Sequence, residues 1–168
     1  MSLRPKELSF RPSKEEDSSF LKEWLNDPKI LFWFPMEGEK EIEDSIRIWI
    51  EYVKKGEGIT ALWDGEPCGM AVLYVQSFKK LAHTCLFSII VSAEHRNVGV
   101  GRALIEELML LAKNTFKIEI LHLEVYEGNP AKHLYERLGF IPFGIHSCFT
   151  KEEGQYRSKI FMQKYLDD

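Results

Sequence analysis

Hydrophobic residues in the first third of the chain recur at the spacing of α-helices. An apolar stripe within residues 20–25 predicts a helix that ends at Pro28, because proline cannot continue a helix. Ser13 and Glu16 have the spacing of a capping box and are expected to open this helix. A second stripe predicts a helix over 39–54.

The remaining two thirds of the chain are predicted to be mostly strands. Apolar runs or alternating patterns predict strands over 8–11, 59–63, 68–76, 82–91, 118–125, 140–149 and 156–166. Helical spacing predicts helices over 102–114 and 131–138. The first of these lies between two strands, so it predicts one parallel crossover. The fold class is therefore α/β (α+β): a mixed sheet with helices on both faces, in a single domain over 1–168.

Charge and hydropathy exclude several kinds of partner. The formal net charge is −4 and the pI is about 5.8, so we expect no nucleic acid as partner, because phosphate backbones are bound by basic faces. No apolar run approaches the ~20 residues of a membrane span, so we expect no membrane partner. Residues 1–10 carry charge and lack the apolar centre of a secretion signal, which favours a cytoplasmic location.

The cysteines and histidines indicate neither a disulfide framework nor a metal site. Cys68, Cys85 and Cys148 each lie in a hydrophobic stretch and are expected to be reduced core residues, as in a cytoplasmic protein. The five histidines are dispersed, and neither His-Glu-x-x-His nor Cys-x-x-Cys occurs. We therefore expect no bound metal.

The most informative segment follows the buried strand that ends at Val91. A polar loop with Gly99 and Gly101 leads directly into a helix, and Arg96 and Arg102 flank the glycines. Backbone N–H groups of such a turn converge on one concavity, and the helix N-terminus adds about half a positive charge. Glycine is expected where a phosphate approaches too closely for a Cβ atom. The segment predicts a pyrophosphate-binding loop.

The motif differs from two nucleotide-binding fingerprints. No Gly-Lys-Ser/Thr sequence of a P-loop is present, and Leu104 stands where the dinucleotide fingerprint needs a third glycine or alanine. What remains is Arg-x-x-Gly-x-Gly over 96–101. Together with Leu-Tyr-x-x-x-Gly-Phe over 134–140, it resembles the acyl-CoA loop of the GCN5-related N-acetyltransferase (GNAT) superfamily. The order of elements is similar over nearly the whole chain, and the opening segment looks like the ribosomal-protein N-terminal acetyltransferase branch.

The resemblance implies a fold, a co-substrate and the residues that hold it. It implies a mostly antiparallel sheet of about seven strands, whose two parallel strands splay to admit the pantetheine arm of acetyl-CoA. The backbone of Ile89, Ile90 and Val91 would pair with pantetheine amides. The N–H groups of Asn97, Val98, Gly99, Val100, Gly101 and Arg102, with Arg96 nearby, would hold the pyrophosphate. Asn129 resembles the asparagine that binds the cofactor before the last helix, although its spacing to Tyr135 is one residue shorter than usual.

The implied reaction is transfer of an acetyl group from acetyl-CoA to a primary amine. Tyr135 occupies the position of the family's tyrosine and is expected to be the general acid for the CoA sulfur. Glu124 matches a glutamate that serves some members as general base. His122, a water chain, or no strong base at all are alternatives. Glu124 can instead simply pair with a lysine, and Tyr135 can be a core aromatic.

The family's acceptor slot lies between the early helices and the last hairpin. Trp33, Phe34 and Glu37 are the candidates for lining it. Alternatively, the aromatic segment, residues 30–36, only ties the early helices to the sheet. The acceptor class is open: a protein N-terminus, a small amine or an aminoglycoside. A homodimer is a further possibility. An acyl-CoA-binding sensor or interaction module with little catalysis is the alternative function.

Overall fold

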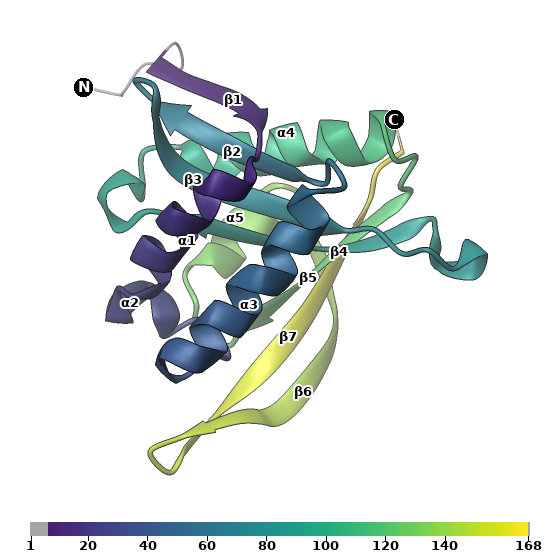
Figure 1. The fold of residues 1–168 in the computed structure, drawn as a ribbon. Coiled ribbons are helices and arrows are strands. Elements are labelled where there is room, and N and C mark those ends of the chain that lie inside the picture. Colours follow the sequence, from purple (N-terminus) through teal and green to yellow (C-terminus); the bar gives the residue numbers. More distant parts are fainter. Residues whose placement is uncertain (1–6, 168) are drawn as a thin grey trace.

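The computed structural model describes residues 7–167 and contains one seven-stranded sheet (Figure 1). Its strands are β1 Leu8–Pro12, β2 Gly58–Trp63, β3 Glu66–Tyr74, β4 Thr84–Val91, β5 Ile120–Tyr126, β6 Ile141–Glu152 and β7 Gln155–Tyr165. Their order across the sheet is β1-β2-β3-β4-β5-β7-β6, and only β4 and β5 are parallel among the described neighbours. The predicted fold class is confirmed.

Helices cover both faces of this sheet. The helices are α1 Ser18–Leu25, α2 Pro28–Leu31, α3 Gly38–Val53, α4 Val100–Asn114 and α5 Ala131–Arg137. One core cluster joins α1, α2 and α3 to Met70, Val72 and Ile90 of the sheet. The other joins α4 and α5 to the opposite face, through residues such as Leu104 and Tyr135. Figure 1 shows α1 and α3 on the near face, α4 behind, and the β6–β7 hairpin extending away from the body.

The parallel pair separates soon after it begins. Only Thr84–Leu86 of β4 pairs with Ile120–His122 of β5. Both strands continue, β4 to Val91 and β5 to Tyr126, without pairing to each other. Because α4 follows β4 and α5 follows β5, the opening between the strands is bordered by both helix N-termini.

Several boundaries differ from the sequence prediction, and two of the differences have a local reason. Ser13 does not cap the first helix, because its Oγ lies 2.8 Å from Thr60 Oγ1; Asp17 instead accepts from the Lys14 N–H at 2.9 Å. α4 begins at Val100 rather than 102, since Gly99 adopts a φ of +93° and takes the N-cap position. β4 begins at residue 84, after a 3₁₀ turn, and a short helix that was not predicted, α2, has Pro28 at its first position and precedes the aromatic residues.

Asp17 is a buried carboxylate that links β1, β2 and α1. It accepts hydrogen bonds from both terminal nitrogens of Arg11 at 2.8 and 2.9 Å and from Thr60 Oγ1 at 2.8 Å. Burial opposes ionisation, but these bonds and the Lys14 N–H outweigh it, so the pKa of Asp17 lies below its usual value. The network orders the segment that leads into the early helices.

Asp17→Ala is expected to destabilise the fold by about 3 kcal/mol, because it leaves Arg11 and Thr60 without their acceptor. This corresponds to a fall in Tm of roughly 6–12 °C for a chain of this size. Since the folded pKa is lowered, the contribution is complete above the unfolded pKa of ~3.9 and is lost as pH falls through the folded value. Calorimetry at pH 7 and pH 3 checks this, and the exposed Asp167→Ala is the control; an equal Tm for both variants would contradict it.

The cysteine prediction is correct for two residues and wrong for the third. Cys68 and Cys85 are buried, and burial raises their pKa to about 11 and about 12, so both thiols stay protonated. Cys148 is exposed on β6, where the register with β7 is irregular and its φ is +55°.

No helix among the described residues is long and apolar enough to cross a membrane. The expectation that residues 1–10 form no secretion signal concerns a segment of which residues 1–6 lie outside the described residues.

Candidate active site

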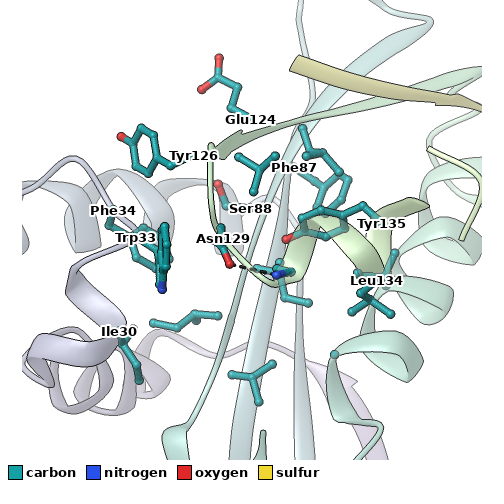
Figure 2. A pocket seen from close by; sticks show the side chains of 18 of the residues that line it. Ile30, Trp33, Phe34, Phe87, Ser88, Glu124, Tyr126, Asn129, Leu134 and Tyr135 are labelled. Atoms are coloured by element: carbon teal, nitrogen blue, oxygen red, sulfur yellow. Dashed lines mark hydrogen bonds between the residues drawn. The ribbon is translucent and has the colours of Figure 1, made fainter. Parts of the chain in front are cut away.

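A cavity of about 860 Å³ occupies the opening between β4 and β5 and extends to both faces of the sheet. Its walls come from α1, α2, α3, the loop before α4, and α5. Figure 2 shows Tyr135 and Leu134 at one side, Trp33, Phe34 and Ile30 at the other, and Ser88 and Asn129 between them. A cleft of this volume is within the range of small-molecule sites.

The loop before α4 has backbone donors that no described residue uses. Between Asn97 and Arg102, no N–H donates a backbone hydrogen bond within residues 7–167, whereas the Ala103 N–H reaches Gly99 O at 3.2 Å. Asn97 and Gly99 have φ values of +62° and +93°. Left-handed residues of this kind occur in turns whose successive amides converge on an anion. These donors and the α4 N-terminus form a site suited to an anion.

Glycine is required at the two positions of the loop for different structural reasons. Gly99 adopts a left-handed conformation, and a Cβ placed on it would meet no described atom within 4 Å. Gly101 lies in the first turn of α4, where a Cβ would approach Leu134 Cδ2 to 3.3 Å and Val91 Cγ2 to 3.9 Å. Gly101 therefore permits close packing of α4 against α5 and β4, rather than only the approach of a phosphate.

Most of the predicted cofactor residues line the cavity. They are Ile89, Ile90, Val91, Arg96, Asn97, Gly99, Gly101, Arg102 and Asn129. Val100 is not in the lining, because its side chain is fully buried in the core, and Val98 packs against the same core. Their backbone amides still belong to the loop. Asn129 accepts from the Ala131 N–H through Oδ1 at 3.0 Å (Figure 2); the α5 N-cap itself is Pro130.

Tyr135 lies on α5 with its ring in the core and its hydroxyl toward the cavity (Figure 2). The residue is 8% exposed and packs edge-to-face against Phe87 and Phe140. Its hydroxyl has no hydrogen-bond partner among the described residues. Burial raises the pKa of Tyr135 to about 12, so the phenol carries its proton at neutral pH. A protonated phenol that faces a cleft can act as an acid.

Glu124 lies on β5 and lines the cavity, and in Figure 2 its carboxylate points away from Tyr135. Its Oε2 accepts a hydrogen bond from Lys159 Nζ at 3.0 Å, so the alternative of lysine pairing is realised. The Glu124 side chain is 38% exposed and that of Lys159 is 11% exposed. Lys159 Nζ also lies 3.4 Å from the centroid of the Phe149 ring. The carboxylate is accessible and restrained by one cation.

His122 shares the face of β5 with Glu124 and Tyr126, as the alternation predicts. It does not line the cavity. Burial lowers the pKa of His122 below 6.5, so it is neutral at pH 7. Burial and the nearby Glu124 raise the pKa of Tyr126 to about 12. On β3 and β4, the hydroxyl of Tyr74 donates to Ser88 Oγ at 3.0 Å, and both residues line the cavity.

The aromatic segment contributes two of the three predicted acceptor residues to the lining. Trp33 and Phe34 line the cavity, whereas Glu37 is exposed at the start of α3 and lies outside the lining. Arg157 of β7 fastens this segment: it donates to Phe32 O at 2.7 Å, and its guanidinium carbon lies 3.8 Å from the Phe32 ring centroid. The last hairpin therefore helps to hold the early helices at the cavity.

Sequence reasoning missed several lining residues. Lys159, Phe149, Tyr74 and Ser88 belong to it. The polar Tyr74 and Ser88 stand in otherwise apolar strands, which was a usable signal. The sequence carries no comparable signal for Lys159, because this residue contacts Glu124 only when β7 pairs with β5. Among the described residues, no group of three or more His, Cys, Asp or Glu side chains is placed to hold a metal ion.

Residues 15–140 match the family model of the Acetyltransferase (GNAT) family. The chain belongs to the GNAT family. The match covers the loop before α4, the cavity strands and α5, and the resemblance stated for these residues is confirmed. It includes both motifs on which that resemblance was based.

Among the relatives of this GNAT protein is an L-amino acid N-acetyltransferase of Escherichia coli K12, 27% identical over 71% of this chain and 76% of that protein. A spermidine N(1)-acetyltransferase of Vibrio cholerae is 26% identical over 96% of each chain. A ribosomal protein bS18-alanine N-acetyltransferase of Haemophilus influenzae is 31% identical over 51% of this chain and 59% of that protein. An acetyltransferase structure from Salmonella typhimurium, solved with acetyl-CoA, superposes with a TM-score of 0.81 at 20% identity over 96% of this chain and 95% of that one, which shows the shared fold.

Proposed function

We propose that this GNAT protein transfers an acetyl group from acetyl-CoA to a primary amine by direct attack in a ternary complex. The N–C bond forms as the C–S bond of the thioester breaks. The attacking amine loses a proton and the CoA sulfur gains one, so the products are the acetamide and the free thiol. The chain must therefore bind two substrates and assist two proton transfers.

The donor half of the cavity fits acetyl-CoA. Unused N–H groups from Asn97 to Arg102 and the α4 N-terminus are suited to a diphosphate, and Arg96 adds positive charge beside them. The β4 backbone over 87–91 has no partner on β5, which leaves room for pantetheine amides to pair as an added strand would. A backbone N–H near Ile90 can polarise the thioester carbonyl. Acetyl-CoA supplies the activated acetyl group.

Two side chains on opposite walls of the cavity are suited to the proton transfers. Tyr135 keeps its proton at neutral pH and faces the cavity from the α5 side, so we assign it as the acid for the departing sulfur. Glu124 is an accessible carboxylate on the α1–α3 side, so we assign it as the base for the acceptor ammonium, directly or through water. Trp33 and Phe34 would contact the acceptor.

The observation that carries this proposal is the set of unused amides at the end of a cavity that also contains both side chains. The experiment is release of free CoA thiol from acetyl-CoA with amino acids, peptides, polyamines and aminoglycosides as acceptors. Amine-dependent thiol release is expected, together with a rise in Tm when acetyl-CoA is added. A rise in Tm without turnover on any amine would favour the acyl-CoA-binding module instead, and no rise would reject both.

Three further sequence predictions stay proposals for this GNAT protein. They are the single domain over 1–168, the cytoplasmic location and the homodimer. Exposed apolar side chains on β6, including Ile141, Phe143 and Ile145, are consistent with a surface that a second copy covers. Light scattering after size-exclusion chromatography gives the oligomeric state.

A further inference from the structure

The acceptor side of the cavity contains one ion pair in otherwise uncharged surroundings. Glu124 is the only carboxylate among the described residues that line the cavity. Lys159, its partner at 3.0 Å, is the only lysine there. The arginines of the lining, Arg96, Arg102 and Arg137, belong to the loop and helices on the donor side. The acceptor therefore meets one negative and one positive side chain.

This charge pattern is unsuited to a polycation. Each additional ammonium group taken into the cavity needs its own carboxylate, because a buried unpaired charge is costly. Glu124 is the single candidate, and Lys159 already neutralises it. Much of the remaining wall is apolar, including Ile30, Trp33 and Phe34. The surroundings suit an acceptor with no net charge and an apolar side chain.

Lys159 has donor capacity that its present contacts leave unused. Its Nζ contacts Glu124 and the face of Phe149, and its side chain is 11% exposed. An ammonium group has three N–H donors, so a second carboxylate can bind beside the first. The ammonium group of Lys159 therefore suits a ligand that brings a carboxylate.

We propose that the acceptor is a free α-amino acid with a large apolar side chain, and that Lys159 binds its carboxylate. The proposal rests on the acetyltransferase function given above. The incoming carboxylate shares Lys159 with Glu124, and the acceptor ammonium takes the place beside Glu124, so the two charges of the zwitterion match the ion pair. The apolar side chain packs among Trp33, Phe34 and Ile30. Lys159 is on this account a specificity-determining residue.

The first test compares L-phenylalanine, L-leucine and L-methionine with their amides and with spermidine. Each amide keeps the amine and the side chain but lacks the carboxylate. For the best of the three amino acids, kcat/KM is expected to exceed that of its amide and of spermidine by about tenfold or more. Equal or higher values for the amide or for spermidine would overturn the inference and leave the acetyltransferase function standing.

The second test measures the same ratio in variants of Lys159. Lys159→Met is expected to reduce the preference for amino acid over amide to about unity, and Lys159→Arg to restore part of it. Lys151→Met, in the exposed end of β6, is the matched control and keeps the preference. An unchanged preference in Lys159→Met would reject the assignment.

Calorimetric measurement of amino acid binding in the presence of CoA tests the carboxylate site at Lys159 separately from the acetyltransferase function. Weaker binding by about tenfold in Lys159→Met supports the carboxylate site even if no amine is acetylated, in which case only the acetyltransferase function fails. Equal binding by the wild type and Lys159→Met, with both folded by circular dichroism, overturns the inference whatever the turnover.

Discussion

Replacement of Tyr135 by phenylalanine is expected to lower kcat by about 100-fold or more while the Kd for acetyl-CoA changes less than about twofold. The substitution removes only the hydroxyl that faces the cavity and keeps the ring that packs against Phe87 and Phe140. Because burial raises the pKa of Tyr135 to about 12, the phenol carries its proton at neutral pH and can donate a hydrogen bond to the sulfur as the C–S bond breaks. Steady-state kinetics and calorimetry with acetyl-CoA give the two quantities.

Tyr165→Phe is the matched control for this prediction. Tyr165 is 60% exposed at the end of β7, outside the cavity lining, so its hydroxyl should not affect turnover. If Tyr135→Phe retains the wild-type kcat under conditions where chemistry limits the rate, Tyr135 is a core aromatic and the acid is another group or water.

Glu124→Gln is expected to lower kcat/KM by about 100-fold at pH 7, because the amide can no longer accept the proton of the acceptor ammonium. The side chain keeps its size and can still accept a hydrogen bond from Lys159. His122→Gln separates this assignment from its alternative. Burial holds the pKa of His122 below 6.5, so a histidine base would make activity fall as pH drops through that lowered pKa. We expect His122→Gln to retain more than about a third of wild-type kcat/KM.

Glu127→Gln serves as the control for Glu124, since it lies just beyond β5, is exposed and does not line the cavity. Tm values for all three variants exclude simple unfolding. A large loss in His122→Gln with little change in Glu124→Gln would transfer the base role to the histidine. Little change in either would indicate attack by an amine that is already neutral.

The donor half of the site was predictable because its signals are local. The apolar run before Val91, the two glycines and the helical spacing after them are contiguous in sequence, and the structure places loop and helix where that order requires. Alternation likewise put Glu124 and His122 on one face of β5. Glu37 shows the limit of such reasoning: its place beside the aromatics in sequence suggested the lining, but the start of α3 carries it outside.

The acceptor half was not predictable, because it depends on pairings between distant strands. β7 inserts between β5 and β6, and this order brings Lys159 to Glu124 and Arg157 to Phe32 across 35 and 125 positions. Nothing in the local pattern of either segment reports such a contact. The predicted cap of the first helix was wrong for a similar reason. Thr60 of β2 forms a hydrogen bond with the hydroxyl of Ser13, and Asp17 accepts the Lys14 N–H instead.

On the function proposed above, main-chain amides before and within the first turn of α4 hold the diphosphate of acetyl-CoA. Arg102 allows a direct measurement, because its N–H is unused and proline is tolerated in the first turn of a helix. Arg102→Ala removes the side chain and its pairing with Glu106 but keeps the N–H, whereas Arg102→Pro removes both. By calorimetry, with both variants folded, Arg102→Pro is predicted to bind acetyl-CoA about tenfold more weakly than Arg102→Ala. Equal affinities of the two variants would contradict the role of that amide.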